Sequence, residues 1–430
     1  MFRTTLIAPL AAGAVVAASL VGAPGASTAR AGQAVWGPRQ PITASNQYTP
    51  TADVAVDAAG NTTAVWSQDG VVQAARRPAG GAWGTPVPIG DGCGPQVGAA
   101  ARGGVTVVWE CGPEGRVMSA SRPLGGGWSD PVAVSEPSAA DGLSGALYPR
   151  LAVSRGGAAV VSWWYGAEDD VPAPPVPRAE AAYRPAGGGW SAPHLLGPAG
   201  EDNPAVAIDA RGNVTAAFLD PQSRVRAVRR VVGRGWSSPV RISADRPQAG
   251  DVEVAVDARG DATALWQLDG RALQAASRPL RHRWSAPASL SSSGDWAAGM
   301  DDAGTALVVE ANALGRISVR SKPLNRPWGP QKTIVRADGS TRSNLQLDLN
   351  ADRDALVSWG EWIGNGDLSD YSSYRPRGGP WGSPQRFADS WEPATALYRN
   401  GNAVAVWARE VLSNPSPIYR VWARTMRAPR

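Results

Sequence analysis

The sequence predicts an all-β protein, an eight-bladed β-propeller of four-stranded antiparallel blades closed by its N-terminal strand. Three observations lead to this fold. A tryptophan followed by a short proline-containing segment recurs at intervals of 44 to 62 residues, at Trp36, Trp83, Trp128, Trp190, Trp236, Trp284, Trp328 and Trp381. Each interval holds three segments that alternate apolar and polar residues. The last set of three has no such tryptophan after it, whereas one extra tryptophan segment stands near the N-terminus.

The first unit illustrates the expected blade. Asp53–Asp57 and Thr62–Ser67 alternate in hydrophobicity, and Val71–Arg77 leads to a Pro-Ala-Gly-Gly turn before Trp83. Period-two alternation broken by Gly, Asn and Asp is typical of short antiparallel strands. We name the four strands of a unit A, B, C and D, with D beginning at the tryptophan. Four short strands in a repeat of this length are one propeller blade.

The two ends of the chain settle the expected blade count. Glu392–Arg427 supplies strands A, B and C of a last blade, and Trp36–Ile42 is the D strand that this blade lacks. Pairing the two would close the ring and remove its unpaired edges. Seven or nine blades remain as alternatives if one unit is misassigned.

Composition and the N-terminal segment set the expected location. Hydrophobic residues make up 43% of the 430 residues and charged residues 18%, which disfavours disorder. Arg3, the apolar stretch Leu6–Val21 and Ala29-Arg30-Ala31 together predict a cleaved signal peptide over residues 1–31. A membrane anchor is the alternative, but the stretch is short for a span. We therefore expect one secreted, extracellular domain over residues 32–430, without a membrane span.

Charge and cysteines narrow the expected partners. Loss of Arg3 and Arg30 with the signal peptide lowers the formal net charge from +5 to +3, so the charge does not favour a nucleic-acid partner. We also expect the protein to be a monomer. Cys93 and Cys111 are the only cysteines. They face each other across a hairpin predicted to turn near Arg102-Gly103, so we expect a structural disulfide between neighbouring strands.

The junction of strands C and D carries a family resemblance. The segment from Ser121 to Trp128 keeps the Ser, Gly and Trp of the Asp-box, S-x-D-x-G-x-T-W, with Pro123 in place of its Asp. Proline takes the same place at Pro78, Pro185, Pro279, Pro323 and Pro376. From Trp36 onward the chain therefore resembles degenerate Asp-box (BNR-repeat) propellers of the secreted, sialidase-like bacterial type. A working sialidase of this family would need three converging arginines and a Tyr nucleophile with a Glu partner, a set that cannot be placed here.

Strand order divides the ring into two faces. We call bottom the face with the A–B and C–D turns, and top the face with the B–C and D–A connections. On the bottom, the short and uniform turns at Asp57, Asp209 and Asp257 fit turn formers better than calcium ligands. A set of basic residues, each six positions before its tryptophan, is either a rim that meets acidic polysaccharide or a set of strand ends leaning on the indoles; it comprises Arg77, Arg122, Arg184, Arg278, Lys322 and Arg375.

Catalytic and cofactor motifs are not found in the sequence. His194 and His282, the two histidines, flank blade tryptophans and have no Ser–Asp partner pattern, so neither a hydrolytic triad nor a histidine metal site is expected. The glycine-rich stretches are repeated turns and not phosphate-binding loops. We expect no metal and no cofactor.

Irregular sequence collects on the top face. The B–C connections expand through Gly166–Arg178, Gly360–Ser373 and Arg409–Arg420, in blades three, seven and eight. Other top-face polar residues are Asp69, Glu110, Asp220, Glu310, Glu201, Asp202, Asn203, Asp251 and Asp295. The candidate ligand contacts are Trp164, Tyr165, Glu168, Asp169, Asp170, Glu361, Trp362, Asp367, Asp370, Tyr371 and Glu410.

Carboxylates beside aromatic rings suit sugar recognition, although an acidic loop is also commonly a solvated edge. The sequence favours a non-catalytic propeller that binds an extracellular polysaccharide or a protein through these loops. The alternative is a sialidase-like glycoside hydrolase or lyase that uses top-face carboxylates. The sequence does not decide whether the protein is an enzyme. Trp362 lies outside the repeat pattern and is the first residue to test.

Overall fold

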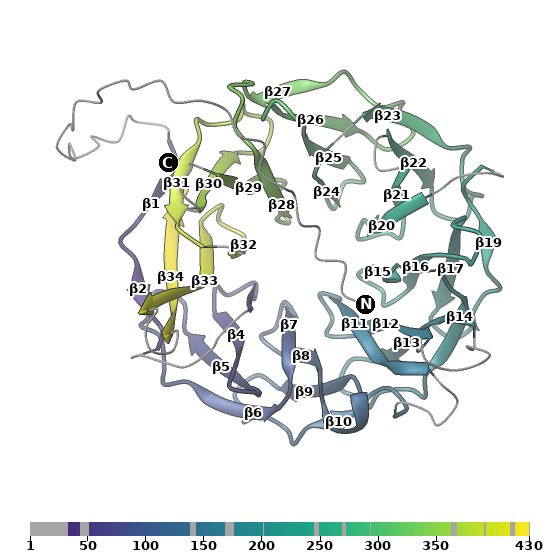
Figure 1. The fold of residues 1–430 in the computed structure, drawn as a ribbon, viewed down its shortest axis with the longest axis horizontal. Coiled ribbons are helices and arrows are strands. Elements are labelled where there is room, and N and C mark those ends of the chain that lie inside the picture. Colours follow the sequence, from purple (N-terminus) through teal and green to yellow (C-terminus); the bar gives the residue numbers. More distant parts are fainter. Residues whose placement is uncertain are drawn as a thin grey trace, which may run out of the picture.

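The protein folds as a closed ring of eight sheets around a central channel (Figure 1). The computed structural model describes residues 33–43, 51–137, 143–167, 176–200, 202–244, 249–268, 272–292, 294–362, 368–390, 393–412 and 418–429. Within these residues the regular structure is β, apart from one 3-10 turn at Pro113–Gly115. The predicted eight-bladed propeller is confirmed. The predicted signal peptide lies outside the described residues.

Each blade is an antiparallel sheet with strand A nearest the channel and strand D outermost. In blades 4 and 8, strand D consists of two short strands that pair with the same strand C. Blades 1 and 2 comprise β3 (Ala52–Val56), β4 (Thr62–Gln68), β5 (Val71–Arg77) and β6 (Val87–Asp91), then β7 (Cys93–Ala99), β8 (Val105–Glu110), β9 (Met118–Arg122) and β10 (Val132–Ala133). Blades 3 and 4 comprise β11 (Leu143–Val153), β12 (Ala159–Ala167), β13 (Arg178–Arg184) and β14 (His194–Pro198), then β15 (Ala205–Ile208), β16 (Val214–Leu219), β17 (Val225–Val231), β18 (Gly235–Trp236) and β19 (Val240–Arg241).

The second half of the ring repeats this arrangement. Blades 5 and 6 comprise β20 (Ala249–Val256), β21 (Ala262–Leu268), β22 (Ala272–Arg278) and β23 (Ala288–Ser292), then β24 (Trp296–Met300), β25 (Ala306–Ala311), β26 (Ile317–Lys322) and β27 (Lys332–Val335). Blades 7 and 8 comprise β28 (Arg342–Leu349), β29 (Ala355–Trp362), β30 (Leu368–Arg375) and β31 (Gln385–Ala388), then β32 (Ala394–Leu397), β33 (Ala403–Leu412), β34 (Ile418–Arg427), β1 (Val35–Trp36) and β2 (Gln40–Pro41).

The N-terminal segment closes the ring as the sequence predicts. Strands β1 and β2 pair antiparallel with β34, with Val35 opposite Arg427 and Gln40 opposite Ala423. Blade 8 therefore takes its outermost strand from the beginning of the chain and its other three from the end. Figure 1 shows the purple N-terminal strands beside the yellow C-terminal one.

The core lies between blades and depends on a second aromatic repeat. The fifth residue of strand B is aromatic and almost fully buried in seven blades: Trp66, Trp109, Trp163, Phe218, Trp266, Trp359 and Trp407. Strand B is flanked by strands on both edges and packed by neighbouring blades on both faces, so its sequence is largely apolar. Blade 6 is the exception, because Glu310 occupies this position.

The predicted long B–C connections of blades 7 and 8 are for the most part strand. Strand β29 runs on to Trp362, opposite Leu368 of β30, and β33 pairs with β34 as far as Leu412. Together with β12 of blade 3, β29 and β33 are the longest B strands among the described residues. Glu361, Trp362, Asp370, Tyr371 and Glu410, which were expected on loops, therefore stand on β29, β30 and β33.

The predicted disulfide is present. Cys93 at the start of β7 is bonded to Cys111, which follows β8, and their Cα atoms are 5.4 Å apart. No free cysteine remains in the protein. The bond links the start of β7 to the end of β8 on the top face of blade 2, where the register between these two strands shifts.

Removing this bond should destabilise the protein measurably. For a Cys93→Ala/Cys111→Ala variant we expect the free energy of unfolding to fall by roughly 3 kcal/mol, mainly because the unfolded chain gains freedom. Chemical denaturation of variant and wild type measures the difference. Thiol titration of the protein unfolded without reductant should find no reactive thiol, and two reactive thiols would refute the pairing.

No described helix is long and apolar enough to cross a membrane.

Candidate functional site

The bottom face carries residues with structural roles. Asp57 Oδ1 accepts hydrogen bonds from the backbone N–H groups of Ala59 and Asn61, at 3.0 and 2.8 Å. The same turn geometry recurs at Asp209 and Asp257. These aspartates hold the A–B turns, as expected from their spacing.

Four of the six basic residues of the bottom face lie against the indoles of their own blades. The guanidinium of Arg77 lies 5.9 Å from the ring centre of Trp83 and donates to Thr425 Oγ1 of blade 8 at 2.7 Å. Such contacts combine cation–π attraction with a bond between blades. The arginine–indole contact recurs at Arg184, Arg278 and Arg375. Of the two interpretations of this set, the structural one fits these contacts.

A large polar cavity opens at the top end of the central channel. Its volume is about 800 Å³. Side chains from seven of the eight blades reach it, because every strand A begins at this end of the channel. Its polar lining comprises Thr51, Asp53, Gln96, Glu110, Tyr148, Arg150, Asn203, Glu253, Gln346 and Thr395.

Tyr148 is the unusual residue of this cavity. Its backbone has φ 53°, in the left-handed region, and its side chain is 47% exposed. Three other A strands carry the same bulge, with Gly94, Asp251 and Asn344 at the left-handed position. Gly, Asp and Asn tolerate this conformation, whereas a large aromatic residue is strained in it. The fold therefore holds an exposed ring at the cavity where the repeat would favour a smaller residue.

Both signs of charge are available beside this ring. The guanidinium of Arg150 lies 3.7 Å from the Glu253 carboxylate, and both side chains are more than one third exposed. Glu110 accepts a hydrogen bond from the backbone N–H of Tyr148 at 2.7 Å, which fixes the bulge. Arg150 donates, Glu253 accepts and Asn203 does both, so the lining matches the two-way hydrogen bonding of hydroxyl groups.

Some polar residues of the channel bind the free inner edges of neighbouring blades. Asp53 Oδ2 of blade 1 accepts from the N–H of Val97 in blade 2 at 2.8 Å. Gln96 Oε1 accepts from the N–H of Leu151 in blade 3 at 2.9 Å. Asp202 and Asp295 do the same for Val252 and Leu345. Exposed strand edges need such partners, so these residues serve the fold first.

Burial makes several of these carboxyl groups weak acids. Burial raises the pKa of Asp53 to about 6, against the lowering effect of hydrogen bonds from Val97 and Val54. Burial, together with the nearby Asp53 charge, raises the pKa of Asp348 to about 7, although Thr395 donates to it. The pKa of Glu253 is also raised by burial, and Arg150 opposes the shift. Of these groups, Asp348 has a pKa close to neutral pH.

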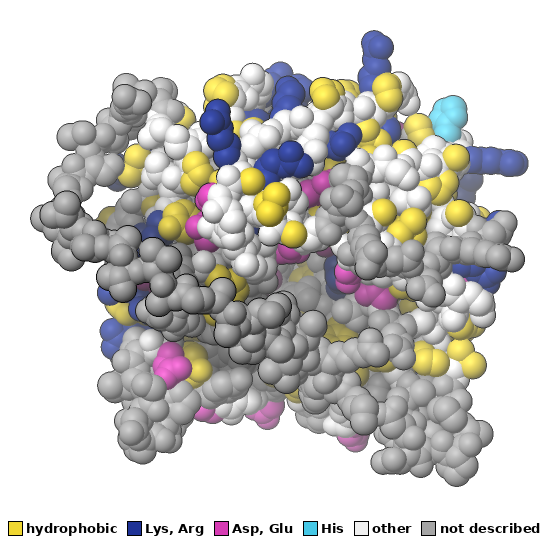
Figure 2. All heavy atoms as spheres, turned by 45° about the horizontal axis from the view of Figure 1, so that its top comes forward, with side chains coloured by type: hydrophobic (Ala, Val, Ile, Leu, Met, Phe, Trp, Pro, Cys, Tyr) yellow, Lys and Arg dark blue, Asp and Glu magenta, His cyan; other side chains and the backbone are white. Residues whose placement is uncertain are grey.

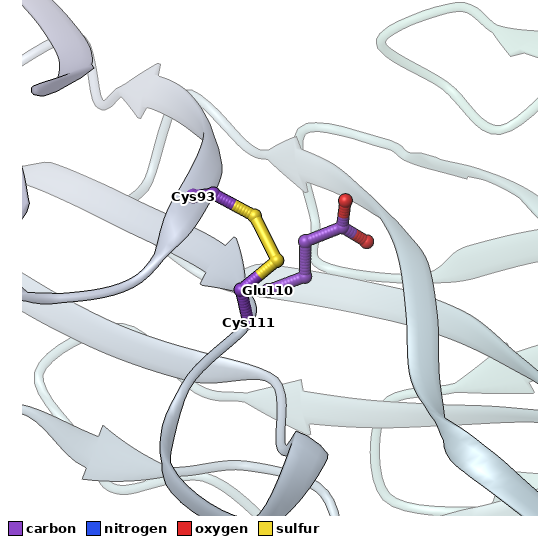
Figure 3. A group of neighbouring side chains, drawn as sticks. All are labelled: Cys93, Glu110 and Cys111. Atoms are coloured by element: carbon purple, nitrogen blue, oxygen red, sulfur yellow. A yellow bond between two sulfur atoms is a disulfide. The ribbon is translucent and has the colours of Figure 1, made fainter. Parts of the chain in front are cut away.

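One cluster contains residue types that commonly bind metals, but its sulfur atoms are not in the form that binds them. Among the described residues, Cys93, Cys111 and Glu110 bring potential ligand atoms within 4.8 Å of one another. Figure 3 shows the two sulfur atoms joined, with the Glu110 carboxylate beside them. Sulfur in a disulfide is not the thiolate that binds metals, so this cluster is a structural staple.

Of the predicted contacts in blade 3, the structure describes the two aromatic residues and not the three acidic ones. Trp164 is partly buried and donates its indole N–H to the carbonyl of Gly200 at 2.8 Å. Tyr165 is buried, with Arg178 over its ring. Glu168, Asp169 and Asp170 lie outside the described residues, as does Asp367 of blade 7.

The predicted contacts of blades 7 and 8 include an exposed ring. Trp362 is 40% exposed at the end of β29, and Glu410 is exposed at the top of β33. Glu361 pairs with the buried Arg342 at 2.9 Å. Tyr371 stacks on Trp359, and Asp370 is fully buried and accepts two hydrogen bonds from Ser390. Among the described members of this set, Trp362 and Glu410 are exposed, whereas Glu361, Asp370 and Tyr371 are half-buried or buried.

Sequence reasoning missed most of the cavity. Tyr148, Arg150, Gln96 and Glu253 were not singled out, whereas Glu110 and Asn203 were noted only as top-face polar residues. A signal existed, because Asp53, Arg150 and Glu253 occupy the same position, four residues before the first residue of the A–B turn. Aligning the repeats on that turn would have shown a polar residue at this position in five of the eight A strands, since Gln96 and Gln346 share it.

Among the described residues drawn in Figure 2, no large apolar patch is visible. There, hydrophobic side chains are scattered among polar ones, and Lys and Arg lie mainly in the upper half of the view.

Comparison with known proteins gives the fold and no family. No protein-family model matches the sequence, and no curated protein matches it. Among solved structures, the chain is similar to the BP39L lectin of Burkholderia pseudomallei, with 17% identity, 79% of this chain and all of that chain covered, and a TM-score of 0.53.

Two further similarities are weaker. A protein of unknown function from Dyadobacter fermentans has 11% identity and a TM-score of 0.44, covering 92% of this chain and 99% of that one. The Aleuria aurantia lectin, solved with α-methyl-L-fucoside, has 12% identity and a TM-score of 0.40, covering 69% and 97%. At 17% identity, the likeness to the BP39L lectin shows the fold alone. Fold and site together define an eight-bladed propeller with a polar cavity on its top face.

Proposed function

We propose that this protein is a glycan-binding propeller that holds its ligand in the top cavity without changing it chemically. The observation that carries the proposal is Tyr148, an exposed aromatic ring kept in a strained backbone conformation at the mouth of a polar cavity. Strain of this kind persists where the rest of the fold enforces it and commonly marks a functional position.

The chemistry around this ring suits a sugar. A pyranose presents an apolar face that stacks on an aromatic ring and hydroxyl groups that need donors and acceptors. Tyr148 offers the ring, Arg150 and Asn203 offer donors, and Glu253 offers an acceptor. Strands of several blades hold these groups, so little order has to be gained on binding. The likeness to a structure described as a lectin supports this assignment.

Trp362 adds a second contact region to the proposal. It stands exposed on the top end of blade 7, away from the cavity lining, with Glu361 next to it. A glycan chain longer than the cavity would pass over such a ring. We include Trp362 and Glu410 as outer contacts for an extended ligand.

The protein is also proposed to act outside the cytoplasm. Its disulfide is of the kind that persists in oxidising compartments, and the signal peptide predicted over residues 1–31 would direct export.

A sialidase-like hydrolase remains the second candidate, favoured by one observation. Asp53 and Asp348 have pKa values of about 6 and about 7, and a catalytic acid must hold its proton near working pH. Both carboxyls bind partners of the fold, which argues for a structural role. Incubation with aryl glycosides at pH 5 to 7 distinguishes the hydrolase from the binding protein. Hydrolysis by the wild type that is lost in Asp53→Asn would support the hydrolase and refute the non-catalytic proposal.

Removing the Tyr148 ring should weaken ligand binding and leave the fold intact. We expect residues 32–430 to recognise glycans on an array, and Tyr148→Gly to lose about 1–3 kcal/mol of binding free energy. Glycine suits the positive φ, so the melting temperature should stay equal or rise.

Trp362→Ala should lose about 1–3 kcal/mol of binding free energy, the scale of one buried aromatic contact, and only for long glycans.

The matched control is Arg211→Ala, an exposed arginine on a bottom-face turn. It should bind like the wild type. An array without any glycan signal, or equal affinities of wild type and Tyr148→Gly, would overturn the proposal.

A further inference from the structure

A second pocket lies between the outer parts of blades 7 and 8. Its volume is about 150 Å³, and it is lined by β31 on one side and by β33, β34 and the β1–β2 segment on the other. Figure 1 shows β31 beside β34 at the left of the ring. The charged residues of its lining are Arg39, Arg386, Arg409, Arg424 and Asp389. Four guanidinium groups thus share the pocket with a single carboxylate.

The repeat does not require two of these arginines. Arg424 of β34 is opposite Ala405 of β33. In six other blades the residue at this place in strand C is small or apolar: Ala75, Ala120, Ala182, Val228, Ala276 and Ser373. Arg39 is third after its tryptophan, where six other repeats have proline: Pro86, Pro131, Pro193, Pro239, Pro287 and Pro384. Two basic residues that blade geometry does not need therefore meet at one pocket.

Asp389 neutralises only part of this positive charge. Its two carboxylate oxygens accept from Arg386 and from Arg409, the latter at 3.0 Å. Among the described residues, the buried Nε of Arg424 has no hydrogen-bond partner. Arg39 lies with its guanidinium 4.8 Å from the ring centre of Trp422, a contact that leaves its N–H groups free to bind another group.

The electrostatics of Arg424 agree with an anion-binding role for this pocket. Burial lowers the pKa of Arg424; Arg39 and Arg386 lower it further, against the opposite effect of Asp389. A desolvated guanidinium crowded by like charges is stabilised by an anion that takes its hydrogen bonds.

We propose that the pocket between blades 7 and 8 binds the oxyanion of an acidic saccharide, a sulfate ester or a carboxylate, through Arg39, Arg386, Arg409 and Arg424. The pocket is large enough for the charged group and part of its sugar ring, and too small for a whole glycan chain. The buried Trp407 and Phe387 form its apolar floor. The source of the oxyanion rests on the proposed glycan-binding function, whereas the anion site itself does not.

The test uses calorimetric titration at low ionic strength with inorganic sulfate and with acetate, then with dextran sulfate, polygalacturonate and neutral dextran. We expect the wild type to bind sulfate, and Arg424→Ala to bind it at least about tenfold more weakly, as for a lost charge-assisted hydrogen bond. Arg39→Pro should weaken it likewise. Both variants restore residues that the repeat already carries, so folding should be preserved.

Arg320→Ala is the matched control. Arg320 occupies the same position in strand C of blade 6, opposite Val308, and lines no part of this pocket. It should bind sulfate like the wild type. Equal affinity of wild type and Arg424→Ala, or an equal loss in Arg320→Ala, would overturn the anion site.

The polymer titrations separate this proposal from the previous one. Dextran sulfate binding that depends on Arg424 assigns a sulfate ester, and polygalacturonate binding that depends on Arg424 assigns a carboxylate. Array binding that needs Tyr148 but not Arg424 would leave the glycan-binding function standing and refute the anion site. Sulfate binding without any glycan binding would refute the glycan-binding function but would still support the anion site between blades 7 and 8.

Discussion

Deleting residues 33–43 should abolish cooperative folding or lower the melting temperature sharply. The deletion removes β1 and β2, the outermost strands of blade 8, and leaves β34 with an open edge. It also removes Trp36, whose ring lies 4.9 Å from that of Phe387 in blade 7 and whose indole N–H donates to Ser372 Oγ at 2.8 Å. Thermal melts followed by circular dichroism measure the effect.

A single substitution isolates the packing part of this effect. Trp36→Ala keeps the strand and removes the ring that packs between blades 7 and 8. We expect it to lower the free energy of unfolding by about 3–5 kcal/mol, the usual cost of truncating a buried tryptophan.

Moving the segment provides the control. Appending residues 33–43 after Arg430 of the deleted chain should restore most of the melting temperature, because β1 runs antiparallel to β34 with Val35 opposite Arg427. The appended strand would then follow β34 through an ordinary C–D turn, as β6 follows β5 in blade 1. A deletion variant that melts like the wild type would show that the ring does not depend on this strand.

The blade count and the closure were predictable because their signal is local and repeated. Each tryptophan segment marks one outer strand, and a strand missing at one end of the chain and present at the other requires pairing of the two. Strand lengths were less predictable. The extension of β29 to Trp362 depends on pairing with Leu368 across five intervening residues, and polar residues there are compatible with either strand or loop.

The cavity was not predictable from spacing because its residues meet only through ring closure. Arg150 of blade 3 and Glu253 of blade 5 are neighbours because strand A of each begins at the same end of the channel. The strain at Tyr148 was equally invisible, since a bulge appears in the sequence as an ordinary strand residue. The arginine pocket combines Arg39 with Arg424, residues from opposite ends of the chain.

Raising the pH from 5 to 8 should destabilise the protein through buried carboxyl groups, most clearly through Asp370. Burial raises the pKa of Asp370 to about 7, although Ser390 donates to it twice. The folded state therefore keeps a proton that the unfolded state releases near its ordinary pKa of 3.8. Between these two values stability falls as pH rises, because the folded state binds more protons. The favourable contribution is complete below the unfolded pKa and is lost as pH passes about 7.

Urea unfolding at pH 5, 6, 7 and 8 measures this loss and assigns it to Asp370. The side chain is fully buried, so its share should be on the order of 3 kcal/mol across the range. Asp53 and Asp348, whose pKa values are about 6 and about 7, add to the trend in the same direction. Asp370→Asn cannot ionise and should flatten the pH dependence, whereas the exposed control Asp130→Asn should keep the wild-type slope. If Asp370→Asn and the wild type lose stability equally between pH 5 and 8, Asp370 is not the group that releases the proton.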